Sequence, residues 1–243
     1  MRGPSVGGGH RSPATVVRAP ACGARMTALP DEIREHYEHH VDEDARLRGG
    51  LGRLEHARVQ EIVRRHLTAG PQRVPDVGGA TFDVALMFGP LYHLPERADR
   101  VAAWREAARV VVPGGLVLGM AISRFASLFD GLAQGHLFEP RFRTLVEADL
   151  ATGRHENPTG DPGWFTTAYF HRPEELRTEA DDAGLEVLEV VGVEGLAPWL
   201  RHLASRWDEP ADRQAILQAA RVIEVEPSVL GLSPHLVAVA RRR

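Results

Sequence analysis

Short apolar runs recur along the whole chain and predict buried strands. Residues 82–88 (FDVALMF) are too few for a typical helix, and a Gly-Pro turn ends the run. Residues 116–121, 185–193 and 235–240 have the same character, and the second of these partly alternates. The chain therefore predicts a sheet whose strands come from its middle and from its C-terminal part.

Longer segments between these runs place apolar residues on one helical face. Residues 51–67 predict an amphipathic helix, whose apolar side consists of Leu54, Val59, Ile62, Val63 and Leu67. A helix predicted to end near residue 110 has its buried stripe at Val101, Trp104, Ala108 and Val111. Further helices are predicted over 31–40, 173–183, 196–207 and 211–225. Strands that alternate with helices indicate an α/β fold.

Residues 122–170 predict a mostly helical cap, inserted after the strand over 116–121. We expect helices over 123–138 and 139–150, then a loop over 151–164. Aromatic, histidine and other polar side chains gather here: Arg124, His155, Asn157, Trp164, Phe165, Tyr169 and His171. Taken singly, each is more often structural or exposed, but as a set they suggest a small, partly apolar acceptor site.

Residues 73–77 predict a short strand that runs into Gly78-Gly79. Only four residues, 78–81, separate it from the next strand. Parallel neighbouring strands need a connection of about a dozen residues or more. Either the two strands form an antiparallel hairpin, to which a Gly-Gly turn is suited, or the first is not a sheet strand.

Composition narrows the class of protein. A chain of 243 residues with 43% hydrophobic residues is long and apolar enough for one sizeable core. The net charge of −4 gives no indication of a nucleic-acid surface, and no apolar run approaches a membrane span. Cys22 is the only cysteine, which excludes a disulfide scaffold and a cysteine zinc site. We expect a cytoplasmic protein that binds no nucleic acid and no membrane.

The N-terminal part is predicted to lie outside the core. Residues 1–25 carry no acidic residue and no apolar signal-peptide region. We expect either a disordered segment ahead of a natural start at Met26, or a transit peptide. His36 and His40 share a face of the first predicted helix, but they have no evident third ligand; we expect a solvated acidic helix and no metal site. The expected divisions are 1–25, 26–70 (helical), 71–121 (α/β core), 122–171 (cap) and 172–243 (C-terminal part of the core).

Three segments carry a resemblance to a known family. Asp76-Val77-Gly78-Gly79 resembles the start of the glycine motif of class I S-adenosylmethionine (SAM)-dependent methyltransferases. Residues 82–94 resemble the fourth sheet strand of that family and the loop after it, and residues 105–115 resemble the following helix and Pro-Gly-Gly turn, which lead into the fifth strand. The resemblance implies a Rossmann-like three-layer sandwich, SAM as cofactor and a small-molecule methyl acceptor.

The resemblance also implies site residues. The expected cofactor contacts are Asp76, Gly78, Gly79 and the backbone of Gly89, Pro90 and Leu91. Tyr92 is expected to position the acceptor, and His93 to act as a general base, because the pKa of histidine lies near working pH. The alternative is that both side chains only shape the loop. The leading helix would close over the cofactor through Tyr37.

The sequence departs from the family after Gly79. The rest of the glycine motif, the second and third strands and the ribose-binding acid have no room between Gly78 and Thr81. We therefore expect a truncated sheet that keeps the fourth, fifth, seventh and sixth strands, with a helical cap. Two functions stay open: a SAM-dependent methyltransferase impaired by this deletion, natural or erroneous, or an inactive methyltransferase-like remnant that acts as a binding or interaction protein. A dinucleotide oxidoreductase is disfavoured because the full glycine fingerprint is absent.

Overall fold

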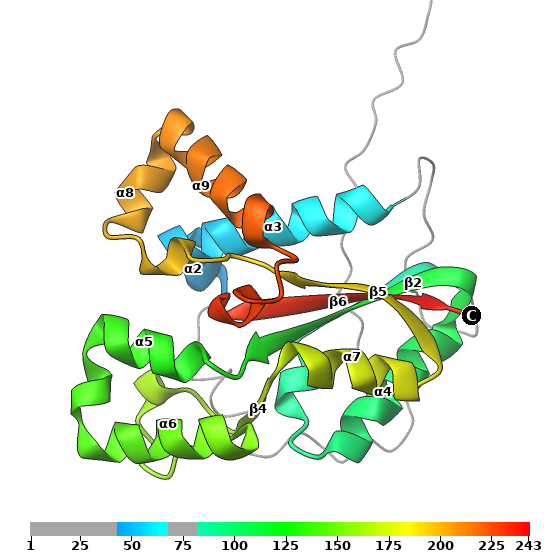
Figure 1. Cartoon of the computed structure of the whole chain (residues 1–243), viewed down its shortest axis with the longest axis horizontal. Helices are drawn as coiled ribbons and strands as arrows, with labels where there is room; N and C mark the ends of the chain where they lie inside the picture. The colour runs from blue at the N-terminus through cyan, green and yellow to red at the C-terminus, as the bar shows by residue number, and fades with distance from the viewer. Residues whose placement is uncertain (1–42, 68–81) are drawn as a thin grey trace, which may run out of the picture.

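The computed structural model describes residues 43–67 and 82–243 of the chain. One mixed sheet runs through it in the order β3-β4-β2-β6-β5, and β1 also pairs with β2 (Figure 1). The strands are β1 (Phe82–Phe88), β2 (Val111–Ser123), β3 (Arg154–His155), β4 (Ala168–His171), β5 (Leu185–Gly192) and β6 (His235–Arg242). The predicted strand over 82–88 is thus confirmed.

Helices lie on both faces of this sheet and beyond its end. The α-helices are α2 (Glu43–Arg48), α3 (Gly50–His66), α4 (Arg97–Val110), α5 (Ala126–Gln134), α6 (Pro140–Thr152), α7 (Pro173–Asp182), α8 (Leu203–Asp208) and α9 (Pro210–Ile223). Short 3-10 helices are η1 (Pro90–His93), η2 (His136–Phe138), η3 (Pro162–Trp164), η4 (Ala197–Trp199) and η5 (Leu230–Leu232). The cap helices α5 and α6 lie past the arrowhead of β2 (Figure 1).

The directions of the central strands confirm the predicted order. β1 runs parallel to β2, from the pair Val84–Leu116 to the pair Phe88–Met120. β6 is antiparallel to β2 on one side and to β5 on the other. The strands β1, β2, β6 and β5 thus lie side by side in the order expected above for a fourth, fifth, seventh and sixth strand. The described chain is therefore a Rossmann-like α/β fold with this part of the sheet.

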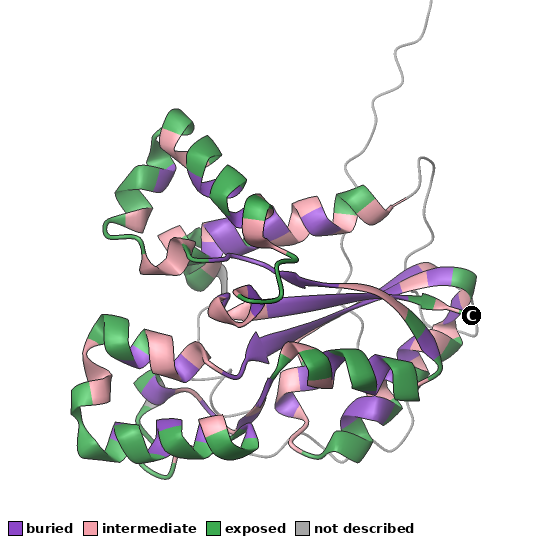
Figure 2. Ribbon diagram, in the orientation of Figure 1, coloured by how far each residue is buried: buried purple, intermediate pink, exposed green. Residues whose placement is uncertain are grey.

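Apolar side chains form a separate core on each face of the sheet. On one face, Trp104 of α4 and Leu176 of α7 are fully buried against the strands. On the other, Ile62 of α3 packs against strand residues, and α8 and α9 pack on α3 through Trp207 and Leu217. Figure 2 shows buried residues concentrated on the strands and on the inner sides of these helices. The three layers agree with the predicted sandwich.

Long-range pairing changes some predicted boundaries. β2 starts at Val111 rather than at residue 116, because the Pro-Gly-Gly segment forms an irregularity within the strand, with Gly114 at φ +79°. The predicted helix over 123–138 is wrong at its start: Ser123 still pairs with β4, so α5 begins at Ala126. The predicted helix over 196–207 is interrupted, because His202 is left-handed (φ 62°).

Other predictions fall outside the described residues. The helix over 31–40, the strand over 73–77 and the Gly78-Gly79 hairpin belong to this group. Within residues 43–67 and 82–243, no helix combines the length and apolar character that a membrane crossing requires.

Candidate functional site

The carboxyl end of the sheet gathers residues that are far apart in the sequence. The parallel strands β1, β2 and β4 end there, and the antiparallel strand β6 begins there, next to the end of β5. In open α/β sheets, ligands bind outside the carboxyl ends of the strands. This edge is therefore the candidate functional site.

The loop after β1 begins with a backbone conformation that glycine favours. Gly89 has φ 138° and ψ −53°, and a β-carbon built there would meet only the Tyr92 hydroxyl, at 3.7 Å. Pro90 is exposed, whereas the Leu91 side chain is fully buried in the core beside Trp104. Of the predicted cofactor contacts in this loop, Gly89 and Pro90 have exposed or partly exposed surface, and the Leu91 side chain belongs to the core.

Tyr92 and His93 lie together and face the cap. Their ring centroids are 4.6 Å apart in an edge arrangement. The His93 ring is stacked on Phe165 of the cap, with centroids 6.2 Å apart, and only 7% of His93 is exposed. The two predicted catalytic side chains are thus in contact, and His93 is enclosed between the β1 loop and the cap.

The structure does not describe several of the remaining predicted site residues. Asp76, Gly78 and Gly79 lie outside the described residues, as do Tyr37, His36 and His40. Whether the glycine segment approaches Gly89 therefore stays a prediction.

Strand β4 continues the sheet edge beyond the end of β1. The β1 pairing ends at Met120, and β4 pairs with the next part of β2, at Ile122 and Ser123. Because β6 occupies the opposite edge of β2, β4 and β1 lie on the same edge. The cap therefore supplies a strand directly past the carboxyl end of β1, where Tyr92 packs against it.

Polar side chains of the cap bond mainly to the protein itself. Arg124 donates to the Phe170 carbonyl at 2.8 Å and to both carboxylate oxygens of Glu175. His155 lies between Asp149 Oδ2, at 2.9 Å, and the Trp164 carbonyl, at 2.8 Å. Arg124 and His155 each hold parts of the cap together through these contacts, and their part in an acceptor site stays a prediction.

The other members of the predicted acceptor set have similar surroundings. His171 contacts Glu179, and Asn157 donates to the Phe165 carbonyl. Trp164 is buried beside Phe142, and Tyr169 lies under the Arg100 guanidinium, 3.5 Å from the ring centroid.

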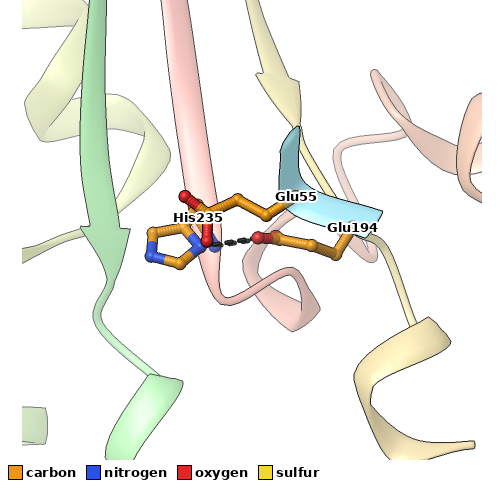
Figure 3. A group of neighbouring side chains, drawn as sticks. All are labelled: Glu55, Glu194 and His235. Carbon is orange, nitrogen blue, oxygen red and sulfur yellow. Dashed lines mark hydrogen bonds and ion pairs between the residues drawn. The ribbon is translucent and has the colours of Figure 1, made fainter. Parts of the chain in front are cut away.

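A second group at the same edge was missed by the sequence analysis. Glu194 follows β5, His235 begins β6, and Glu55 lies on α3; Figure 3 shows their polar groups turned toward one another. His235 Nδ1 is 2.6 Å from Glu194 Oε1. The side chain of Glu194 is fully buried, and that of His235 is 20% exposed. No spacing in the sequence relates these three residues.

The electrostatics of this group favour a proton on the imidazole. Burial alone would lower the pKa of His235, but the neighbouring carboxylates of Glu194 and Glu55 outweigh it and raise that pKa to about 9. Burial would likewise raise the pKa of Glu194, but His235 and the Ser233 hydroxyl lower it. At neutral pH Glu194 and His235 form a partly buried ion pair that joins the end of β5 to the start of β6.

Glu55 is held at this site by close contact between two helices. Arg46 of α2 donates to Glu55 Oε2 at 2.7 Å. A β-carbon at Gly52 would lie 2.1 Å from the Arg46 carbonyl oxygen. Since only glycine leaves room for this approach, Gly52 lets α2 place Arg46 beside Glu55.

Comparison with known proteins gives limited similarity. No protein-family model and no curated protein sequence matches the chain. A solved SAM-dependent methyltransferase from Methanosarcina mazei is 15% identical over 70% of this chain and 63% of its own, with a TM-score of 0.38. The CcbJ methyltransferase from Streptomyces caelestis is 17% identical over 70% of this chain and 64% of its own, with a TM-score of 0.35.

A third solved structure is similar to the same extent. It is a SAM-dependent methyltransferase from Thermotoga maritima, described as a possible histamine N-methyltransferase, 19% identical over 76% of this chain and 69% of its own, with a TM-score of 0.36. The chain spans less than two thirds of the length of the first two proteins. Identities and TM-scores of this size establish neither a common activity nor a common ligand.

Proposed function

We propose that this chain is a SAM-dependent methyltransferase that transfers a methyl group to a small molecule. The observation that carries the proposal is the sheet order, in which β6 is antiparallel between β2 and β5, beside the parallel pair β1–β2. This order is the one that the family resemblance of residues 82–94 and 105–115 implies. Fold and motif, which are separate observations, thus support the same function.

The backbone of Gly89 supports a ligand at the end of β1. A glycine there leaves open the space that a β-carbon would fill, so a ligand is able to approach the main chain closely. In this proposal Gly89, Pro90 and Leu91 contribute backbone contacts to the cofactor. Asp76, Gly78 and Gly79, which lie outside the described residues, contribute the rest.

The chemistry of this proposal is mainly positioning. Bound SAM supplies a methyl group on a sulfonium sulfur, and the protein must hold the acceptor atom in line with it. Tyr92 is suited to orient the acceptor, because its hydroxyl lies next to Gly89. His93 takes a proton if the acceptor must lose one, which requires that the acceptor enter between the β1 loop and Phe165.

A second candidate is an inactive methyltransferase-like protein that binds a small molecule or a partner. The observation that favours it is the packing at the carboxyl end of β1, where β4 continues the edge and where Leu91 and His93 are buried. In this alternative, the strand and loop that would form the cofactor site serve only to hold the cap.

Calorimetric titration with S-adenosylhomocysteine separates the two, after circular dichroism has shown that the protein is folded. The first proposal expects saturable binding at micromolar Kd, about −8 kcal/mol. Gly89→Ala should weaken this binding at least tenfold. Gly160→Ala is the matched control, since Gly160 also has positive φ (68°) with open space around it. A folded protein that binds no S-adenosylhomocysteine contradicts the first proposal and favours the second.

A further inference from the structure

Glu55, Glu194 and His235 bring metal-ligating atoms to one place. A ligand atom from each of the three side chains can be chosen so that all lie within 4.8 Å of one another. The residues come from α3, the turn after β5 and the start of β6, so the fold itself assembles them (Figure 3). We propose that these three side chains bind one divalent transition-metal cation, and that Zn²⁺ fits them best.

The kinds of ligand atom select the metal. Zn²⁺ accepts imidazole nitrogen together with carboxylate oxygen, whereas Mg²⁺ and Ca²⁺ prefer six or more oxygen ligands. Zinc–ligand bonds of about 2.0–2.2 Å in a tetrahedron place the ligand atoms about 3.4 Å apart. Nδ1 of His235 and Oε1 of Glu194, now 2.6 Å apart, would separate slightly, and Glu55 would move closer.

Glu194 is already oriented as a ligand. The Ser233 hydroxyl donates to Glu194 Oε2 at 2.9 Å, and the backbone N–H of His235 donates to the same oxygen at 3.1 Å. Oε1 is thereby left toward His235. Ser233 is itself fixed, because its oxygen accepts from the backbone N–H groups of Glu194 and Gly195. Hydrogen bonds of this kind orient metal ligands and keep the carboxylate ionised.

Charge also favours a cation here. Two carboxylates meet at a buried position, and Arg46 compensates for only one of them. A divalent cation between the two carboxylates places positive charge beside both of them.

The location indicates an open site. Three protein ligands leave a fourth position for water or for an oxygen of a bound molecule, which is typical of catalytic rather than structural zinc. His235 keeps 20% of its side chain exposed at the carboxyl end of the sheet, so the three-residue group borders solvent on the His235 side. This inference does not rest on the proposed methyl transfer, and it holds or fails without it.

The test is metal titration of tag-free protein that has been treated with EDTA and dialysed into metal-free buffer at pH 8. Isothermal titration with Zn²⁺ should give one site of micromolar or tighter affinity. Co²⁺ should give the visible absorption of a tetrahedral centre, and Zn²⁺ should raise the thermal midpoint of unfolding.

Substitutions assign the site. Glu55→Gln and His235→Asn should each weaken Zn²⁺ binding at least tenfold. His66→Asn is the matched control: His66 also contacts a carboxylate, Glu189, at 2.8 Å, but it is not part of the three-residue group. If His235→Asn does not fold, Zn²⁺ binding by Glu55→Gln, which changes a residue of α3, tests the proposal alone. The absence of saturable binding to the wild type, or binding that both substitutions leave unchanged, overturns the proposal and leaves an ion pair.

Discussion

Trp104 occupies the space that Gly119 leaves on the sheet. A β-carbon at Gly119 would lie 2.3 Å from Trp104 Cη2 and 2.9 Å from Leu91 Cδ1. Trp104 and Gly119 are both buried, and their contact brings α4 onto the middle of β2. The absence of a side chain at position 119 therefore determines how closely the helix packs, and with it the position of the β1 loop through Leu91.

Gly119→Ala should destabilise the protein by about 1–3 kcal/mol, because an extra methyl group has no room in this core. The free energy of unfolding in urea measures the effect. Trp104→Phe removes the ring atoms that the methyl group would strike, so Gly119→Ala should cost less in that background. An equal cost in both backgrounds would show that the contact with Trp104 is not the cause.

Glu179→Gln should be among the most destabilising single changes in the chain. Arg100 and Glu179 form a buried ion pair, with Nη2 2.8 Å from Oε1 and both side chains at most 2% exposed. The substitution removes the negative charge beside Arg100 and leaves that buried cation with neutral acceptors, such as the carbonyls of Leu94 and Pro95. We expect a loss of about 3–5 kcal/mol, measured by urea unfolding.

The neighbouring pair of Arg97 and Asp182 provides the control. Its atoms are 2.6 Å apart, but more than half of each side chain is exposed. Asp182→Asn should therefore cost less than about 1 kcal/mol. Similar losses for Glu179→Gln and Asp182→Asn would argue against a dominant effect of burial.

The protein should lose stability as the pH falls from 7 to 5, and His171 should account for part of the loss. Burial lowers the pKa of His171 below its ordinary value, although Glu179 acts in the opposite direction. The unfolded chain takes up a proton at this residue below about pH 6.5, and the folded protein does so only at lower pH. Because the unfolded state then binds more protons, stability decreases with falling pH.

His171→Gln tests this assignment, since its amide keeps a donor for Glu179. The free energy of unfolding of this variant should fall less steeply between pH 7 and 5 than that of the wild type. His56→Gln makes the same substitution at an exposed histidine on α3 and serves as the control. A slope that His171→Gln does not alter would assign the acid sensitivity to other groups.

Local sequence patterns predicted the elements that form the sheet and its covering helices. The continuous run of β1 and the apolar face of α3, with Leu54 and Ile62 fully buried, depend on neighbouring residues alone. The boundaries that failed depend on distant contacts. Ser123 stays in β2 because β4 pairs with it, and nothing near His202 in the sequence indicates its left-handed backbone.

The residues of the candidate site differ in the same way, because some are predicted by local sequence and others only by long-range contacts. Gly89, Tyr92 and His93 were found because they follow a recognisable strand, and the end of a strand predicts the position of its loop. Glu55, Glu194 and His235 come together only when β5 and β6 pair and α3 crosses them. Only a long-range prediction of these contacts would have found this group.

Asp149→Ala should loosen the cap while leaving the sheet intact. Asp149 is buried, and its Oδ2 accepts from the Ser127 hydroxyl at 2.5 Å and lies 2.9 Å from His155 Nδ1. The other ring nitrogen of His155 donates to the Trp164 carbonyl, which links α6 to the segment before β4. Without the carboxylate, these buried groups lose their acceptor, at a cost of about 1–3 kcal/mol each.

Hydrogen–deuterium exchange locates this effect. In Asp149→Ala, amides of residues 154–171 should exchange at least tenfold faster than in the wild type, while those of β5 and β6 keep their protection. Glu147→Ala removes an exposed carboxylate from the same helix and should change neither region. Equal loss of protection in the cap and the sheet would show that the two regions unfold together, and it would contradict the prediction.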